Sequence, residues 1–138
     1  MDKHFDIIVV GCGPTGAIAS LLLAQKGLQV AIVEQHQNVY PHPRAIALNG
    51  FSMGLIKELL QDLWSEFEYT TAVEVGYVLS KDKMNEPFGK MQPPIIEGKI
   101  LDLDHYGFLN WFNQPQLERL LRKKIESTKN IQTYFNYT

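Results

Sequence analysis

The sequence predicts an α/β fold with a parallel β-sheet, and three features near the N-terminus carry this prediction. An apolar, β-branched run, Phe5–Val10, is typical of a strand buried on both faces. A glycine-rich turn, Gly11–Gly16, leads into an apolar helical segment that stops before Gly27. A second apolar run, Leu28–Val33, ends at the acidic Glu34. This order of strand, turn, helix, strand and acid predicts a Rossmann-like βαβ unit that binds a dinucleotide.

Each position of the turn has a physical role in such a unit. Gly11 permits the tight turn, Gly13 lets the backbone approach a pyrophosphate, and Gly16 lets the helix pack closely on the sheet. Pro14 is tolerated because the N–H that it lacks would be unpaired at a helix start. With Thr15, these residues form the candidate phosphate-binding turn, where the unpaired N–H groups of the first helical turn face the ligand.

Glu34 lies 23 positions beyond Gly11, where a carboxylate accepts the hydroxyls of an adenosine ribose. Gln35, the next residue, is a further candidate contact. This acid does not separate NAD from FAD, because both cofactors contain the adenosine ribose. An NAD-dependent dehydrogenase therefore stays open as an alternative at this point.

Bulk properties narrow the class of protein. A chain of 138 residues buries one core, and its net charge of −2 gives no basic surface for nucleic acid. A single cysteine, Cys12, excludes an internal disulfide and suits the reducing cytoplasm. No apolar run reaches the length of a membrane span.

The middle of the chain predicts a loop, a helix and a hairpin. Residues 35–44 contain two prolines and should form an extended loop near the nucleotide. Asn49 is expected to cap a helix, which Trp64 and Phe67 close. Alternation over Thr71–Leu79 predicts a strand, and after a turn at residues 81–85 the segment Pro87–Met91 returns as a weaker strand. Residues 91–104 should be a connecting excursion.

The last part of the chain predicts a helix and a strand. Asn113 or Gln114 caps the helix, with Pro115 in its first turn. A final strand is expected at Ile131–Phe135. Because the strands predicted here leave a sheet incomplete, we expect the chain to be the N-terminal part of a longer protein. The helix should bury Leu117, Leu120, Leu121 and Ile125 and should expose Glu118, Arg119, Arg122, Lys123 and Lys124.

Three motifs together resemble one family. They are the glycine turn with Glu34, the sequence Pro43-Arg44-Ala45, and Asn113-Gln114-Pro115 followed by Leu117-Glu118. The chain resembles the class A flavoprotein monooxygenases, the FAD-dependent aromatic hydroxylases. With Tyr106-Gly107-Phe108 included, it is most similar to the 3-(3-hydroxyphenyl)propionate hydroxylase group. The tetracycline- and rifampicin-modifying monooxygenases are close alternatives.

The resemblance implies an FAD-binding sheet of the glutathione-reductase type, incomplete here, with a hairpin inserted from the start of a substrate domain at about residues 70–104. It implies that Gly11, Gly13, Gly16, Glu34, Arg44 and Gln114 contact FAD. NADH or NADPH would be the co-substrate, and oxygen and a phenolic or related aromatic compound would be the reactants. The family's later Asp-Gly and Gly-Asp motifs are absent from the sequence, so no residue here is assigned a catalytic role, and a truncated, non-catalytic fragment stays an alternative.

Other kinds of site have weaker support. No nucleophile elbow of a hydrolase is present, and no Lys-Ser/Thr pair follows Gly16, which excludes the phosphate-binding loop of nucleotide triphosphatases. The four histidines lack metal-ligand spacing. Asp102 and Asp104 are expected to be solvated, and Cys12 is expected to be a small turn residue and not a reactive thiol.

Overall fold

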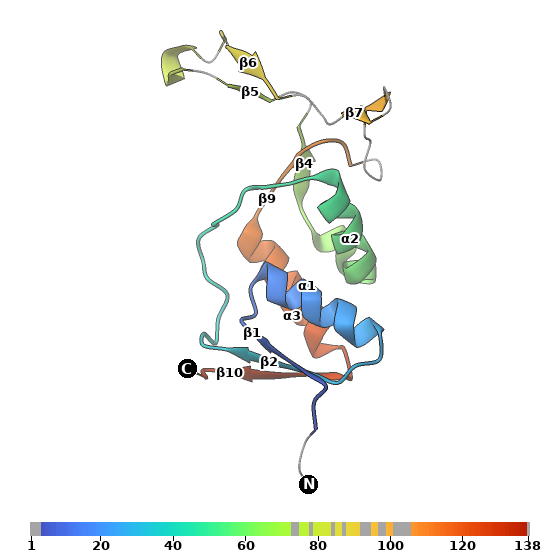
Figure 1. Ribbon diagram of the computed structural model, residues 1–138. Helices are drawn as coiled ribbons and strands as arrows, with labels where there is room; N and C mark the ends of the chain where they lie inside the picture. Colours follow the sequence, from blue (N-terminus) through green and yellow to red (C-terminus); the bar gives the residue numbers. More distant parts are fainter. Residues whose placement is uncertain are drawn as a thin grey trace.

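The computed structural model contains the predicted parallel sheet. It describes residues 4–72, 75–77, 79–83, 85–86, 88–91, 95–96, 99–100 and 106–137. Strands β1 (Ile7–Val10), β2 (Val30–Glu34) and β10 (Ile131–Phe135) form a three-stranded sheet in the order β1-β2-β10. Both pairings are parallel (Figure 1), and Ile7 and Ile131 are each paired with Val30. The predicted α/β fold is confirmed.

Two helices lie on the same side of this sheet. Helix α1 (Pro14–Gln25) connects β1 to β2, and helix α3 (Gln114–Glu126) leads into β10 (Figure 1). Gly27 has a positive φ of 85° just beyond α1, as expected of a helix terminator. Within α1, the buried Ser20 donates its hydroxyl to the carbonyl oxygen of Gly16 at 2.8 Å, so no polar atom of this side chain is left unpaired.

Strand β1 is not buried on both faces, which corrects the prediction for its residues. Ile8 is 65% exposed and Val10 is 85% exposed, whereas Val9 packs against the core. Because β1 pairs with β2 alone and both helices lie on one side, only one face of this strand is covered. In the central strand β2, by contrast, Val30, Ala31 and Ile32 are all buried.

Helix α2 (Gly50–Leu60) begins at the predicted cap. The side chain of Asn49 accepts a hydrogen bond from the Ser52 N–H at 2.8 Å. A 3₁₀ helix, η1 (Gln61–Glu66), follows directly, and Phe67 closes the cluster at 5% exposure. The core that α1, α2 and α3 share contains Leu21, Met53, Ile56, Leu59, Leu60, Leu117, Leu121 and Ile125.

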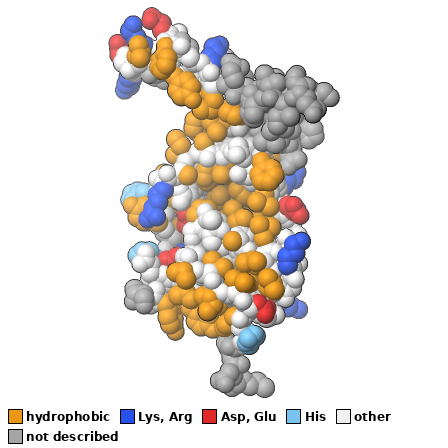
Figure 2. All heavy atoms as spheres, viewed as in Figure 1, with side chains coloured by type: hydrophobic (Ala, Val, Ile, Leu, Met, Phe, Trp, Pro, Cys, Tyr) orange, Lys and Arg blue, Asp and Glu red, His pale blue; other side chains and the backbone are white. Residues whose placement is uncertain are grey.

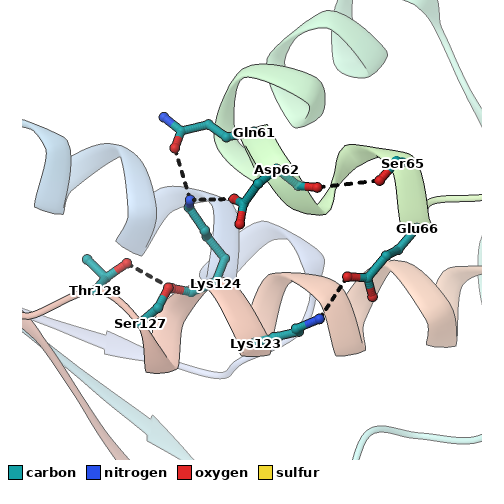
Figure 3. Close-up of polar contacts among 8 residues, drawn as sticks. All are labelled: Gln61, Asp62, Ser65, Glu66, Lys123, Lys124, Ser127 and Thr128. Carbon is teal, nitrogen blue, oxygen red and sulfur yellow. Dashed lines mark hydrogen bonds and ion pairs between the residues drawn. The ribbon is translucent and has the colours of Figure 1, made fainter.

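Two lysines of α3 tie it to η1 (Figure 3). Lys123 Nζ lies 2.8 Å from Glu66 Oε1. Lys124 Nζ lies 3.0 Å from Gln61 Oε1 and 3.5 Å from Asp62 Oδ1. Partly exposed ion pairs add little to stability, so the buried apolar stripe of α3 holds the helices together. The predicted exposure of Lys123 is confirmed, and Lys124 lies at the edge of the same face.

A second sheet lies where the predicted excursion, at about residues 70–104, leaves the rest of the chain. Strands β3 (Ala47–Leu48), β9 (Asn110–Phe112) and β4 (Tyr69–Thr71) pair antiparallel in the order β3-β9-β4. The buried side chain of Asn110 accepts a hydrogen bond from the Thr71 hydroxyl at 2.8 Å, which joins β9 to β4.

The predicted hairpin is present but its first strand is divided. Strand β5 (Gly76–Tyr77) pairs with β6 (Gly89–Lys90), and η2 (Lys81–Lys83) lies between them. The single strand expected over Thr71–Leu79 is wrong, because β4 pairs with β9 whereas β5 pairs with β6. Val73, Glu74 and Val78 of that run lie outside the described residues. The hairpin lies away from the helices (Figure 1). Later in the chain, β7 (Ile95–Ile96) pairs with β8 (Lys99–Ile100).

Candidate nucleotide-binding site

A cleft of about 270 Å³ opens where β1 and β2 end and α1 begins. This is the edge of a parallel sheet at which ligands bind in open α/β folds. The structure brings seven of the nine predicted site residues to this cleft: Gly11, Gly13, Pro14, Glu34, Gln35, Arg44 and Gln114. Thr15 lines a neighbouring groove instead, and Gly16 packs behind the turn.

The three glycines of the turn have different surroundings. Gly11 has a φ of 98°, a conformation that favours glycine, and its N–H donates to the Val33 carbonyl oxygen at 2.7 Å. A Cβ on Gly16 would collide with the carbonyl oxygen of Gly11. No atom lies within 4 Å of the place where a Cβ on Gly13 would be, so this backbone faces open space in the cleft. Gly11 and Gly16 therefore shape the turn, and Gly13 leaves room for a ligand.

Glu34 holds the turn and the following loop together. Its Oε2 accepts the Cys12 N–H at 2.7 Å and its Oε1 accepts the His36 N–H at 2.8 Å. Burial acts to raise the pKa of the Glu34 carboxyl, but these two N–H groups, together with the positive charge of Arg122, outweigh it and hold the pKa below its ordinary value. Each oxygen keeps a lone pair for a further donor, such as a ribose hydroxyl.

The lowered pKa of Glu34 predicts a pH dependence of stability. A carboxyl with a lower pKa in the folded state stabilises the fold above its unfolded pKa, and this contribution is lost as the pH falls through the folded pKa. The free energy of unfolding should therefore decline as the pH falls below 4.5, the ordinary pKa of a glutamate carboxyl. Urea titrations at a series of pH values measure this dependence. The Glu34→Gln variant should show a smaller change of the free energy of unfolding with pH, because it lacks the Glu34 carboxyl. Equal slopes in both proteins would contradict the prediction.

Gln114 connects α3 to the loop that contains Arg44. Its Oε1 accepts the N–H groups of Arg44 at 2.8 Å and Ala45 at 2.6 Å, and its Nε2 donates to Glu118 Oε1 at 2.7 Å. The Arg44 guanidinium carbon lies 4.4 Å from the centroid of the Tyr40 ring, and both side chains line the cleft. A direct contact between Gln114 and a cofactor stays a prediction.

Five residues that line the cleft are missing from the predicted set: His36, Asn38, Tyr40, Glu118 and Arg122, of which the last two belong to α3. Glu118 is 6% exposed, so its expected place on the solvated face is wrong. Arg122 is partly buried; it donates to the Gln37 carbonyl oxygen at 2.8 Å and lies over the Phe135 ring. Positions 114, 118 and 122 are each four residues apart and therefore share one helix face. This row of polar residues at helical spacing was the signal in the sequence that could have placed Glu118 and Arg122 beside Gln114 at the cleft.

Cys12 lies in the glycine turn, between Gly11 and Gly13. The thiol is buried, and burial raises the pKa of Cys12 although Arg122 acts in the opposite direction. This is the environment of an inert turn residue. Among the described residues, no three His, Cys, Asp or Glu side chains are grouped to hold a metal ion. Asp102, Asp104 and His105 lie outside the described residues.

A comparison with protein families matches residues 4–138 to the FAD binding domain. The chain belongs to the FAD binding domain family. The predicted cofactor, FAD, is therefore confirmed for this family member, and NAD as the principal ligand is disfavoured. The cleft fits the group, because Gly13 leaves open space beside the first turn of α1 while Glu34 and Arg44 line the same cavity.

Relatives agree with the predicted flavoprotein class. A probable NADH-specific resorcinol 4-hydroxylase from Rhodococcus jostii is 35% identical over 94% of this chain and 23% of its own length. A 4,4'-diapophytoene desaturase from Methylomonas is 44% identical, but over only 36% of this chain and 9% of its own length. The hydroxylase match extends over far more of this FAD binding domain. The resemblance to FAD-dependent aromatic hydroxylases is confirmed, and the finer assignment to one hydroxylase group stays a prediction.

A solved structure shares the fold. The p-nitrophenol 4-monooxygenase of Pseudomonas putida superposes with a TM-score of 0.73 at 20% identity, over 99% of this chain and 33% of that protein. The FAD binding domain described here thus spans a third or less of these proteins. In the described part of the chain, no helix is both long enough and apolar enough to cross a membrane.

A second, larger groove of about 590 Å³ lies beside the cleft. Thr15, Arg44 and Gln114 line it together with apolar residues of α1 and α2, including Ile18, Leu22, Leu55 and Ile56. Figure 2 shows hydrophobic side chains gathered over the face of these helices. Thr15 is thus close to the nucleotide cleft without lining it.

Proposed function

We propose that this chain is the FAD-binding region of an NAD(P)H-dependent monooxygenase that hydroxylates a phenolic or related aromatic compound. The observation that carries the proposal is the cleft, in which Gly13, Glu34 and Arg44 surround one cavity at the start of α1. The extended match to the resorcinol hydroxylase supports the phenolic class of substrate and favours NADH. Oxygen and the aromatic compound are the small-molecule partners.

Residues at the cleft and in the adjoining first turn of α1 would hold the ADP half of FAD. Pro14, Thr15 and Gly16 form the start of α1, whose unpaired N–H groups and positive dipole end favour the pyrophosphate. Gly13 allows its close approach, and Glu34 accepts the ribose hydroxyls. Gln35 follows Glu34 along the wall of the cleft. Arg44, whose guanidinium is exposed, supplies positive charge that complements a phosphate.

When bound, FAD would supply the redox chemistry for a hydroxylation that consumes oxygen and NADH or NADPH. This chain contributes binding and orientation, and we assign none of its residues to catalysis. We further propose that residues 70–104 begin the substrate domain, since the β5–β6 hairpin lies away from the FAD-binding body (Figure 1). The single cysteine supports a cytoplasmic location.

Titration of the 138-residue chain with FAD, followed by flavin fluorescence, tests the binding proposal. Arg44→Ala should weaken FAD binding about tenfold, the cost of one charge-assisted hydrogen bond. Arg119→Ala is the matched control, because Arg119 is an exposed arginine of α3 that does not line the cleft. NAD⁺ bound more tightly than FAD would overturn the proposal.

An assay with FAD, NADH and resorcinol tests the reaction. Formation of a hydroxylated product with consumption of NADH would assign the whole activity to this chain. Flavin binding without product would limit the chain to a binding role and would place the reaction in a longer protein.

A further inference from the structure

We infer that Glu118 is a positioning residue for the loop that presents Arg44, and that it acts through the side-chain amide of Gln114. The inference rests on the proposed FAD-binding role of this cleft. It assigns a function to a buried carboxylate that the sequence pattern places on a solvated helix face.

A continuous series of hydrogen bonds leads from the buried side chains of α3 to the loop. Gln114 is 7% exposed and Glu118 is 6% exposed. Glu118 Oε1 accepts a hydrogen bond from Gln114 Nε2 at 2.7 Å, and Gln114 Oε1 accepts the N–H groups of Arg44 and Ala45 at 2.8 and 2.6 Å. These last two bonds join residues 70 and 69 positions apart, so they hold tertiary and not local structure.

The chemistry of the Glu118 and Gln114 side chains determines the orientation of the Gln114 amide. An ionised carboxylate only accepts hydrogen bonds, so it selects the NH₂ end of the Gln114 amide. The amide oxygen is then directed at the loop, where two backbone N–H groups need an acceptor. Without an acceptor at position 118, the buried Nε2 would lose this partner, and the orientation that accepts from Arg44 and Ala45 would be less favoured.

The loop depends on this anchor. Residues 38–45 are all described and contain no helix or strand. Among the described residues, the hydrogen bonds that join this segment to other parts of the chain are the two that Gln114 accepts. The Arg44 side chain itself is exposed and contacts Tyr40 of the same loop. The backbone anchor at Arg44 and Ala45 therefore decides where the guanidinium lies relative to Glu34 and the glycine turn.

Hydrogen exchange of the Arg44 and Ala45 amides, measured by NMR on the flavin-free chain, reads this anchor directly. Glu118→Met, which removes the acceptor at similar size, should make both amides exchange about tenfold faster, the equivalent of one hydrogen bond. Glu118→Gln keeps an acceptor oxygen and should stay close to wild type. Glu126→Gln is the matched control, because it changes an exposed carboxylate of the same helix. Unchanged exchange in a folded Glu118→Met protein would overturn the inference.

An exchange of the two side chains provides a second test. Gln114→Glu alone places two carboxylates together and should release the loop. The double variant Gln114→Glu/Glu118→Gln restores a donor at 118 and an acceptor at 114, so it should recover the amide protection. Failure of the double variant to recover it, in a protein with native circular dichroism, would contradict the inference.

Flavin titration of the same variants separates the two proposals. The inference predicts that Glu118→Met also weakens FAD binding about fivefold, by loosening Arg44. If wild type binds no FAD while the exchange results hold, the proposed function fails and the anchor stands. If FAD binds but exchange is insensitive to position 118, the anchor fails alone.

Discussion

Replacement of Gly16 by alanine should lower the free energy of unfolding by about 3 kcal/mol, the upper range for overpacking a well-packed site. The added methyl group would collide with the carbonyl oxygen of Gly11, a backbone atom that cannot rotate away as a side chain could. Either α1 would move from β1 or the turn would open. Urea unfolding followed by circular dichroism measures the loss.

Gly13→Ala is the matched control for this prediction. A Cβ at Gly13 meets no atom within 4 Å, and Gly13 does not have a positive φ, so the fold should keep its stability to within about 0.5 kcal/mol. The methyl group would instead occupy the cleft, and FAD affinity should fall about tenfold through a steric clash with the pyrophosphate. The two glycines thus separate a fold defect from a binding defect. Equal stability losses in the two variants would contradict this account of the turn.

Glu34→Ala should weaken FAD binding about 100-fold, the cost of losing charge-assisted hydrogen bonds at a partly buried site. The carboxylate has two tasks. It accepts the N–H groups of Cys12 and His36, and in the proposed complex it accepts the ribose hydroxyls. Its removal leaves both backbone donors without this acceptor and deforms the turn before any ligand arrives. Flavin fluorescence and urea unfolding together measure the two effects.

Asp6→Ala is the control for a general loss of stability. Asp6 Oδ2 accepts the N–H of Gln29 at 2.8 Å, which is the same type of carboxylate-to-backbone bond, at the opposite end of β1. Its loss should reduce stability and leave FAD affinity unchanged, because Asp6 is distant from the cleft. If both variants weakened FAD equally, general destabilisation and not a ribose contact would explain the Glu34 result.

Local signals in the sequence determined a large part of this protein. The glycine spacing and the two apolar runs predicted the βαβ unit, because strand periodicity and the conformational freedom of glycine act over a few residues. The cap at Asn49, the helix start at Asn113 and the apolar stripe of α3 followed from equally local rules and are confirmed. The same signals brought Glu34 to the cleft, since an acid at the end of a second parallel strand lies beside the first turn.

Tertiary structure decided the rest, because burial and hydrogen-bond partners depend on which elements meet. An apolar strand such as β1 has one bare face when both helices pack on the other. Alternation predicted one strand over Thr71–Leu79, but Thr71 belongs to β4, which pairs with β9, whereas β5 pairs with β6. Glu118, a charged residue of α3, is buried where its carboxylate accepts a hydrogen bond from Gln114. Gln114 in turn binds Arg44, which lies 70 positions earlier in the chain, and no helix pattern contains such a contact. Long-range hydrogen bonds of this kind depend on the packing of distant segments, and only the folded chain specifies them.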